Sequence, residues 1–219
     1  MRNLLPKKLL RRIIFAVLAG SVVAAILLAI FVRNLGATKL DIAITEEVQE
    51  NASRPMDLLM RVVSATADPI VSMILITVVA VFLVAIQRQR EALFLLVVPF
   101  ADIFGSMIKN IVARPRPSEF IANISTEVSG SSFPSGHVIH AVIFFGYLFA
   151  LSFVIKELPT FVRWIVATSS VLIIILMSVS RIYLGAHWAS DVIGGYLIGF
   201  PMLAILLLAY FHITRPSQL

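Results

Sequence analysis

Apolar residues in this chain come in long continuous runs separated by short polar stretches. A helix needs roughly 20 apolar residues to cross the hydrocarbon core of a bilayer, whereas the strands of a membrane barrel would alternate over about ten residues. The runs therefore predict an all-α protein, an integral membrane bundle of six transmembrane helices. The expected spans cover about residues 13–32, 69–86, 92–111, 135–155, 164–183 and 187–211.

Two connections between the expected spans are long. The first, 33–68, has apolar residues at helical spacing in 40–48 and 56–63, which predicts two short amphipathic helices in the first outer loop. They would form either a cap packed on the bundle or a lipid-contacting lid near a site entrance. The second, 113–134, is rich in Pro, Ser and Gly and is expected to be a loop. We expect 1–219 to form one membrane-embedded domain.

Composition supports this interpretation. The chain is 59% apolar and 14% charged, whereas soluble domains are about 45–50% apolar and about 25% charged. Its formal charge of +6 would suggest nucleic acid in a soluble protein, but membrane topology and an anionic substrate explain the basic residues here, so no nucleic-acid partner is expected. Cysteine is absent, which excludes disulfides and thiolate metal sites.

The distribution of Lys and Arg predicts the orientation. With the N-terminus inside, ten basic residues fall on the inner side and eight on the outer side. Four of the outer eight lie in the motifs described below, and the other four lie in a loop that is also rich in acidic residues. We therefore expect both termini to be cytoplasmic, with the first run retained as a span and not removed as a signal peptide. The compact loops favour a bacterial cell-membrane protein.

Three polar clusters interrupt the apolar pattern. They lie at 109–117, where the third span ends, at 133–137, where the chain enters the fourth, and at 180–191, across the turn between the fifth and sixth. Although the clusters are far apart in sequence, a six-span topology places all three on the same outer side. They are therefore expected to form one site.

Three cations in these clusters, Lys109, Arg116 and Arg181, are expected at or near bilayer depth. Charges there are costly unless they are paired or face water. A lone arginine would snorkel to the headgroups, but three converging cations favour an anion, and arginine forks fit phosphate oxygens. Arg114 could equally contact a lipid headgroup or the substrate. Ser135 and Gly136, at a helix start, would add backbone N–H groups to an anion site.

Two histidines supply candidate catalytic groups. His187 and Asp191 are four residues apart at the start of the sixth expected helix and share a face. The aspartate would either orient the imidazole for nucleophilic attack or simply bond a structural histidine. His137, on the same side, is placed to protonate a leaving oxygen. Together with the cations, these groups form a phosphoryl-transfer set that needs no metal, and the cations would repel zinc.

These clusters resemble the three signature motifs of the type 2 phosphatidic acid phosphatase superfamily. Residues 109–117 match Lys-x(6)-Arg-Pro, 132–137 contain Pro-Ser-Gly-His, and 180–191 match Ser-Arg-x(5)-His-x(3)-Asp. The order and relative spacing of the motifs agree, and the resemblance covers about 92–211. It implies an integral membrane lipid phosphatase without a metal or other cofactor.

The resemblance also implies a role for each matching position. His187 would be the nucleophile and form a phosphohistidine, Asp191 would orient it, and His137 would protonate the departing group. The remaining matched positions would bind the phosphoryl oxygens: Lys109, Arg116 and Arg181, assisted by Ser135 and Gly136.

The expected partners are the bilayer and a lipid phosphate or pyrophosphate. Undecaprenyl pyrophosphate and phosphatidylglycerol phosphate are the substrates that the resemblance and the compact size favour, and an outward site favours the former. The main alternative is a lipid phosphotransferase that uses the same site. A related haloperoxidase is disfavoured by the six spans, and a non-catalytic member by the complete motifs. The sequence makes no prediction of oligomeric state.

Four further polar or aromatic residues lie near the clusters. Asp102 lies two turns before Lys109 and would either tune that lysine or pair with another buried polar group. His140 would be a packed helix residue or a neighbour of the catalytic groups. Trp188 and Tyr183 fit an interfacial aromatic belt.

Overall fold

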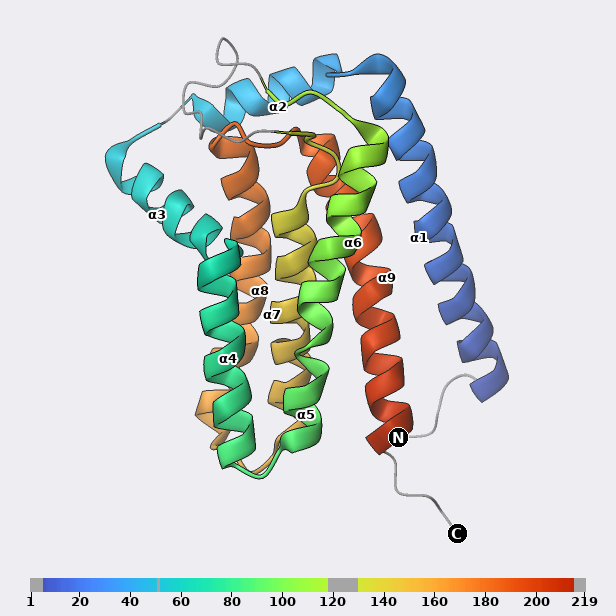
Figure 1. Ribbon diagram of the computed structural model, residues 1–219, viewed down its shortest axis with the longest axis vertical. Coiled ribbons are helices and arrows are strands. Elements are labelled where there is room, and N and C mark those ends of the chain that lie inside the picture. Colours follow the sequence, from blue (N-terminus) through green and yellow to red (C-terminus); the bar gives the residue numbers. More distant parts are fainter. Residues whose placement is uncertain (1–5, 51, 118–129, 215–219) are drawn as a thin grey trace.

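A computed structural model shows the fold and describes residues 6–50, 52–117 and 130–214 (Figure 1). The regular secondary structure of these residues is entirely helical. In chain order the helices are α1 (Lys7–Leu35), α2 (Lys39–Gln49), α3 (Arg54–Ala65), α4 (Pro69–Ala85), α5 (Gln89–Phe94), α6 (Val97–Val112), α7 (Gly136–Val154), α8 (Thr160–Tyr183) and α9 (Ala189–Thr214).

The long helices run side by side, with α1 beginning and α9 ending at the same end and α2 lying across the opposite end (Figure 1). Helix α7 is the centre of the bundle, because it packs against α6, α8 and α9. Its residues Val138, Ile139 and Val142 are fully buried. Helix α1, in contrast, packs mainly on α9 and leaves most of its apolar side chains exposed, as expected for a helix that faces lipid.

Among the described residues, five helical segments are long and apolar enough to cross a bilayer, and a sixth span results if α3 and α4 are counted as one bent unit. The five are α1, α5 with α6, α7, α8 and α9. Helix α4 has 17 residues, which is roughly 25 Å of helix, and it joins α3 at an angle of 63°. The expected all-helical membrane bundle is confirmed, with five or six spans according to whether the bent pair counts as one.

Both short helices expected in the first outer loop are present as α2 and α3. Helix α2 begins with a capping box in which the Thr38 hydroxyl accepts from the backbone N–H of Asp41, and the Asp41 carboxylate accepts from that of Thr38. Helix α3 packs against α8, where Ser180 Oγ donates to the carbonyl of Met60 over 2.7 Å. These contacts fit the cap packed on the bundle.

The aromatic-belt interpretation of Tyr183 and Trp188 is wrong. Both side chains are only 2% exposed. Tyr183 donates to Asp57 Oδ1 over 2.5 Å, and Trp188 Nε1 donates to the carbonyl of Pro115 over 3.1 Å. They pack inside the end of the bundle where α2 lies because each polar tip finds a protein partner there.

Glycines let α9 approach α7 closely. A Cβ on Gly195 would lie 2.9 Å from Val138 Cβ and 3.0 Å from the carbonyl oxygen of Ser135, and one on Gly199 would lie 3.1 Å from Val142 Cβ. The two glycines are four residues apart, the spacing by which small residues bring membrane helices together. This approach sets the distance between the helix that carries His137 and the helix that carries Asp191.

Candidate active site

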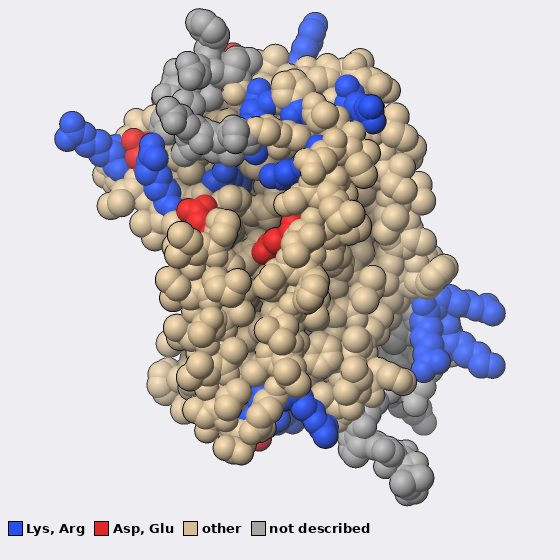
Figure 2. All heavy atoms as spheres, in the orientation of Figure 1, with Lys and Arg blue, Asp and Glu red and all other residues tan. Residues whose placement is uncertain are grey.

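The three polar clusters meet at the end of the bundle where α2 lies. Figure 2 shows Lys and Arg atoms within a hollow on the face between α4 and α6, with acidic atoms at its edge. Arg116 Nη1 donates to the carbonyl of Ala186, and the N–H of Ser135 donates to the carbonyl of Asp191, so hydrogen bonds join the three clusters. The helical bundle therefore brings the clusters together as expected.

Lys109 lies in the last turn of α6 and reaches the start of α7. Helix α6 is followed by Ala113, which has left-handed backbone angles (φ 53°) and donates its N–H to the carbonyl of Lys109. A Cβ on Gly136 would lie 3.7 Å from Lys109 Nζ. That distance is an ordinary van der Waals contact, so the ammonium lies beside the first turn of α7.

Arg116 follows α6 in a segment without regular secondary structure and is held by backbone carbonyls. Its Nε donates to Gly130 over 3.0 Å, and its Nη1 donates to Ala186 over 2.6 Å. Burial lowers the pKa of Arg116 below its ordinary value, but an arginine remains charged at neutral pH. These carbonyls fix the guanidinium beside the turn that carries His187.

Arg181 lies in the last turn of α8 and is 3% exposed. Its Nη1 donates to the hydroxyl of Ser64 from α3, whereas its Nε has no hydrogen-bond partner among the described residues. Its carbonyl accepts the N–H groups of Ala186 and His187, each over 3.1 Å. The same residue therefore supplies a cation and shapes the turn that presents His187.

Ser135 is the N-cap of α7, after the cis peptide bond between Phe133 and Pro134. Its N–H donates to the carbonyl of Asp191 over 3.1 Å, which ties the start of α7 to the start of α9. Its hydroxyl is buried and has no partner among the described residues. The hydroxyl is therefore available to a bound anion, as are the N–H groups at the helix start.

His187 lies in the turn before α9, not at the start of that helix as the sequence suggested. Its side chain is 1% exposed, and its Nδ1 is 3.7 Å from Asp191 Oδ2, beyond hydrogen-bond length. That oxygen accepts the N–H of Trp188 over 2.8 Å. Burial, followed by the charges of Arg181 and Lys109, holds the pKa of His187 well below its ordinary value, so the imidazole is neutral.

His137 lies in the first turn of α7 with its own carboxylate partner. Its Nε2 is 3.0 Å from Asp68 Oδ1, at the bend between α3 and α4. The Asp68 side chain is 53% exposed. The site thus has a second histidine–aspartate pair besides His187 and Asp191, and it could not be recognised from the motifs.

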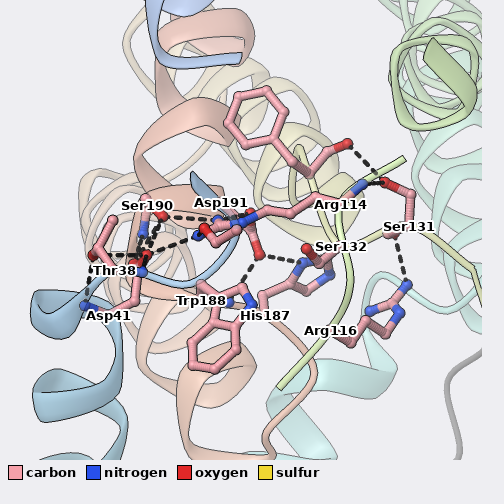
Figure 3. A network of polar contacts seen from close by, with 12 residues as sticks. Thr38, Asp41, Arg114, Arg116, Ser131, Ser132, His187, Trp188, Ser190 and Asp191 are labelled. Carbon is pink, nitrogen blue, oxygen red and sulfur yellow. Dashed lines mark hydrogen bonds and ion pairs between the residues drawn. The ribbon is translucent and has the colours of Figure 1, made fainter. Parts of the chain in front are cut away.

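Arg114 contacts neither lipid nor the hollow. Its side chain is 0% exposed and forms ion pairs with Asp191 and, over 2.7 Å, with Asp41 of α2. Figure 3 shows the guanidinium lying between these carboxylates. Both roles considered for Arg114, a lipid-headgroup contact and a substrate contact, are therefore wrong.

Asp102 pairs with His140 and not with Lys109. Its Oδ2 is 3.0 Å from His140 Nδ1, and His140 Nε2 is 3.2 Å from the hydroxyl of Ser72. This chain links α6, α7 and α4 below the hollow. In the part of the chain that the structure describes, no group of three or more His, Asp or Glu side chains is arranged to hold a metal ion.

A sequence profile described as the PAP2 superfamily matches residues 90–215. The chain belongs to the PAP2 superfamily. The match covers all three clusters and the helices from α5 to α9. It confirms the resemblance drawn from the motifs.

Similar curated proteins are phosphatases. Phosphatidylglycerophosphatase B of Bacillus subtilis (strain 168) is 30% identical over 128 residues, covering 57% of this chain and 61% of that protein. The undecaprenyl-diphosphatase of Sulfolobus acidocaldarius is 29% identical over 126 residues, covering 55% and 56%. Lipid phosphate phosphatase delta of Arabidopsis thaliana is 30% identical over 120 residues, covering 50% and 28%. The chain thus spans less than two thirds of each relative's length.

Solved structures share the fold. The crystal structure of the first transmembrane PAP2 type phosphatidylglycerolphosphate phosphatase from Bacillus subtilis superposes with a TM-score of 0.75 at 20% identity, covering 92% of this chain and 98% of that one. Aquifex aeolicus LpxE superposes with a TM-score of 0.62 at 20% identity, covering 79% and 98%. The bundle described above is therefore a PAP2-type transmembrane fold.

The sequence did not reveal the partners that the first half of the chain contributes. Asp41 follows Thr38 by three residues and Asp68 precedes Pro69, so each has the sequence pattern of an ordinary helix start. Ser64 has no distinguishing pattern at all. Only the folded chain shows that these side chains reach Arg114, His137 and Arg181.

Proposed function

We propose that this protein is a metal-independent lipid phosphatase that removes a phosphate from a lipid phosphate or pyrophosphate. The observation that carries the proposal is a buried, neutral His187 beside Lys109, Arg116 and Arg181. A neutral imidazole is a nucleophile, and cations around it stabilise the charge of a transferring phosphoryl group. The names of the relatives and the PAP2 match support the same chemistry.

Unpaired polar atoms in the site support a bound phosphoryl group. Buried polar atoms normally have hydrogen-bond partners, yet Ser135 Oγ and Arg181 Nε have none among the described residues. Phosphate oxygens would accept from both. Arg116 would add charge from a guanidinium already oriented by carbonyls, and Lys109 would add a mobile ammonium at the start of α7.

The reaction would proceed in two balanced steps. The Nδ1 of His187 faces Asp191, so Nε2 attacks phosphorus while the bond between phosphorus and the leaving oxygen breaks. His137 gives a proton to that oxygen, and the product lipid departs with its alcohol or shorter phosphate. Water then attacks the phosphohistidine, loses a proton to His137, and releases inorganic phosphate.

We infer that the site faces the outer side of the membrane and that the substrate is undecaprenyl pyrophosphate or phosphatidylglycerol phosphate. The exposed Lys8, Arg11 and Arg12 at the beginning of α1 lie at the end away from the site, and basic residues favour the cytoplasmic side. A site at the outer headgroup level would meet lipids of the outer leaflet. The relatives' names cover both candidate substrates.

The test is phosphate release by purified protein from a panel of lipid phosphates and pyrophosphates. His187→Ala should abolish release, because it removes the proposed nucleophile. His212→Ala changes an exposed histidine in the last turn of α9 and serves as the matched control. Wild-type activity in folded His187→Ala would refute the nucleophile. Phosphate appearing on an added lipid alcohol, and not in solution, would identify a phosphotransferase.

A further inference from the structure

Arg114, Asp41 and Asp191 form a fully buried ion network next to His187, the proposed nucleophile. Arg114 is 0% exposed in its side chain, and the two carboxylates that flank it, Asp41 and Asp191, are 3% and 0% exposed. Neither Arg114 nor Asp41 occupies a signature position of the three motifs. A buried charge is tolerated only when it is paired and hydrogen-bonded, so the arrangement of this network is strongly constrained.

Both terminal nitrogens of Arg114 have defined partners, whereas its buried Nε has none among the described residues. Arg114 Nη1 donates to Asp191 and, over 2.8 Å, to Ser190 Oγ, while its Nη2 donates to Asp41 over 2.7 Å and to the carbonyl of Gly36 over 2.8 Å. Asp41 Oδ1 also accepts the N–H of Ser190 over 2.9 Å and its hydroxyl over 2.7 Å. Asp41 therefore holds both Arg114 and the first turn of α9, which carries Asp191 (Figure 3).

Helix α2 is anchored at both ends to the helices that carry the site. Asp41, near its start, binds the beginning of α9, and Gln49, its last residue, donates to the carbonyl of Tyr183 at the end of α8 over 2.8 Å. Burial opposes ionisation of Asp41, but hydrogen bonds from Ser190, Thr38 and Arg114 together hold its pKa below its ordinary value. Asp41 is thus a charged carboxylate at neutral pH.

The charges show what Asp41 contributes. Two carboxylates and one guanidinium carry a net charge of −1. Because Asp41 neutralises Arg114, Asp191 keeps negative charge on Oδ2, the oxygen that faces His187 Nδ1. Without the Asp41 charge, the full positive charge of Arg114 would act on Asp191 alone. The carboxylate would then stabilise less well the positive charge that His187 acquires when it bonds to phosphorus.

We propose that Asp41 is a positioning residue for the reaction, acting through Arg114 and Asp191 on His187. The proposal rests on the proposed function, since it requires His187 to be the nucleophile. Asp41 does not reach the hollow, so it takes no part in binding the lipid. Its loss should slow formation of the phosphohistidine and leave substrate affinity unchanged.

The experiment compares Asp41→Asn, which keeps the shape and removes the charge, with Thr45→Val. Thr45 is buried on the same helix, and its hydroxyl only donates to the carbonyl of Asp41 over 2.9 Å. We expect Asp41→Asn to lower kcat and the single-turnover rate of phosphohistidine formation about 10- to 100-fold, by analogy with the loss when the partner that orients a metal-binding histidine is removed, with KM within about twofold. Thr45→Val should retain wild-type kcat.

A double-mutant cycle tests whether Asp41 acts through Arg114. Arg114→Gln leaves two buried carboxylates without their cation, so it should be slower than Asp41→Asn. The double variant should be no slower than Arg114→Gln alone. If kcat of the double variant instead falls by the product of the two single fold-changes, Asp41 does not act through Arg114. If Arg114→Gln fails to fold, the comparison of Asp41→Asn with Thr45→Val decides by itself, because an Asp41→Asn kcat within twofold of wild type overturns the proposal.

The two proposals fail in distinguishable ways. If His187→Ala keeps activity, the nucleophile and the proposed function are wrong. If His187→Ala is inactive while Asp41→Asn is fully active, only the role of Asp41 is wrong. If Asp41→Asn and Thr45→Val lose the same thermal stability as each other and the same kcat as each other, the role of Asp41 is purely structural. That result would also overturn the proposal.

Discussion

Replacing Gly195 by Ala tests how precisely the contact between α7 and α9 sets the site. The added Cβ would lie 2.9 Å from Val138 Cβ and 3.0 Å from the Ser135 carbonyl oxygen, whereas carbon atoms pack best at about 3.5–4.0 Å. The helices must therefore separate by about 0.6 Å. Overpacking costs about 1–3 kcal/mol, and the better helix propensity of Ala returns about 1 kcal/mol, so the net loss of stability is at most about 2 kcal/mol.

The effect on the reaction should be larger than the effect on stability. Ser135 donates to the Asp191 carbonyl across this contact, so separation moves Ser135 and His137 away from His187 and Asp191. A misplacement of about 1 Å can slow a reaction about 100-fold, and we expect kcat for phosphate release to fall about tenfold or more.

Gly20→Ala is the matched control for Gly195→Ala. It makes the same change in α1, where a Cβ meets nothing within 4 Å. Both variants are assayed for kcat and for thermal unfolding in detergent. A Gly195→Ala protein with wild-type kcat would show that the spacing of α7 and α9 does not control the chemistry.

Three further predictions follow from the site and the topology. The folded chain keeps His187 neutral, whereas the unfolded chain takes up a proton there below about pH 6.5, so stability falls by up to about 1.4 kcal/mol per pH unit as pH drops from 6.5. His187→Gln should therefore lose less stability than wild type between pH 7 and pH 5, and equal losses would contradict the lowered pKa. A chelator should leave phosphate release unchanged, and inhibition reversed by Mg²⁺ would refute the metal-independent scheme. Because the chain has no cysteine, a single Glu47→Cys on α2 should react with a membrane-impermeant thiol reagent on intact cells and Arg90→Cys at the other end should not; the opposite pattern would invert the orientation.

Most of the bundle was predictable because its helices are defined by hydrophobic runs that need no tertiary information. The bend between α3 and α4 was not, since Asp68 and Pro69 look like the start of a new helix and nothing local shows that the preceding helix continues into it. The boundary at α9 was also misplaced. His187 lies in a turn whose N–H groups donate to the carbonyl of Arg181, and the spacing of apolar residues in the sequence does not show this contact.

The site was predictable where chemistry repeats in motifs and unpredictable where it depends on burial. Lys109, His137 and His187 stand out as polar residues in apolar surroundings. Arg114 looks the same in the sequence, but the fold encloses it between two carboxylates. Its partner Asp41 lies 73 residues away, and the capping pattern explains that aspartate without any reference to a site.

The contacts made by the residues before position 90 bear on whether segments of two PAP2 proteins can be joined into a working chimera. The segment that matches the PAP2 superfamily begins at residue 90, yet its charged and histidine groups bind side chains that precede it. The contacts pair Arg114 with Asp41, Arg181 with Ser64, His137 with Asp68 and His140 with Ser72. A chimera that joins this segment to the leading helices of another member would carry every signature residue and still lack these partners. Activity in such a hybrid should return only when the donor helices supply matching side chains at the four positions, so the portable unit is the whole bundle.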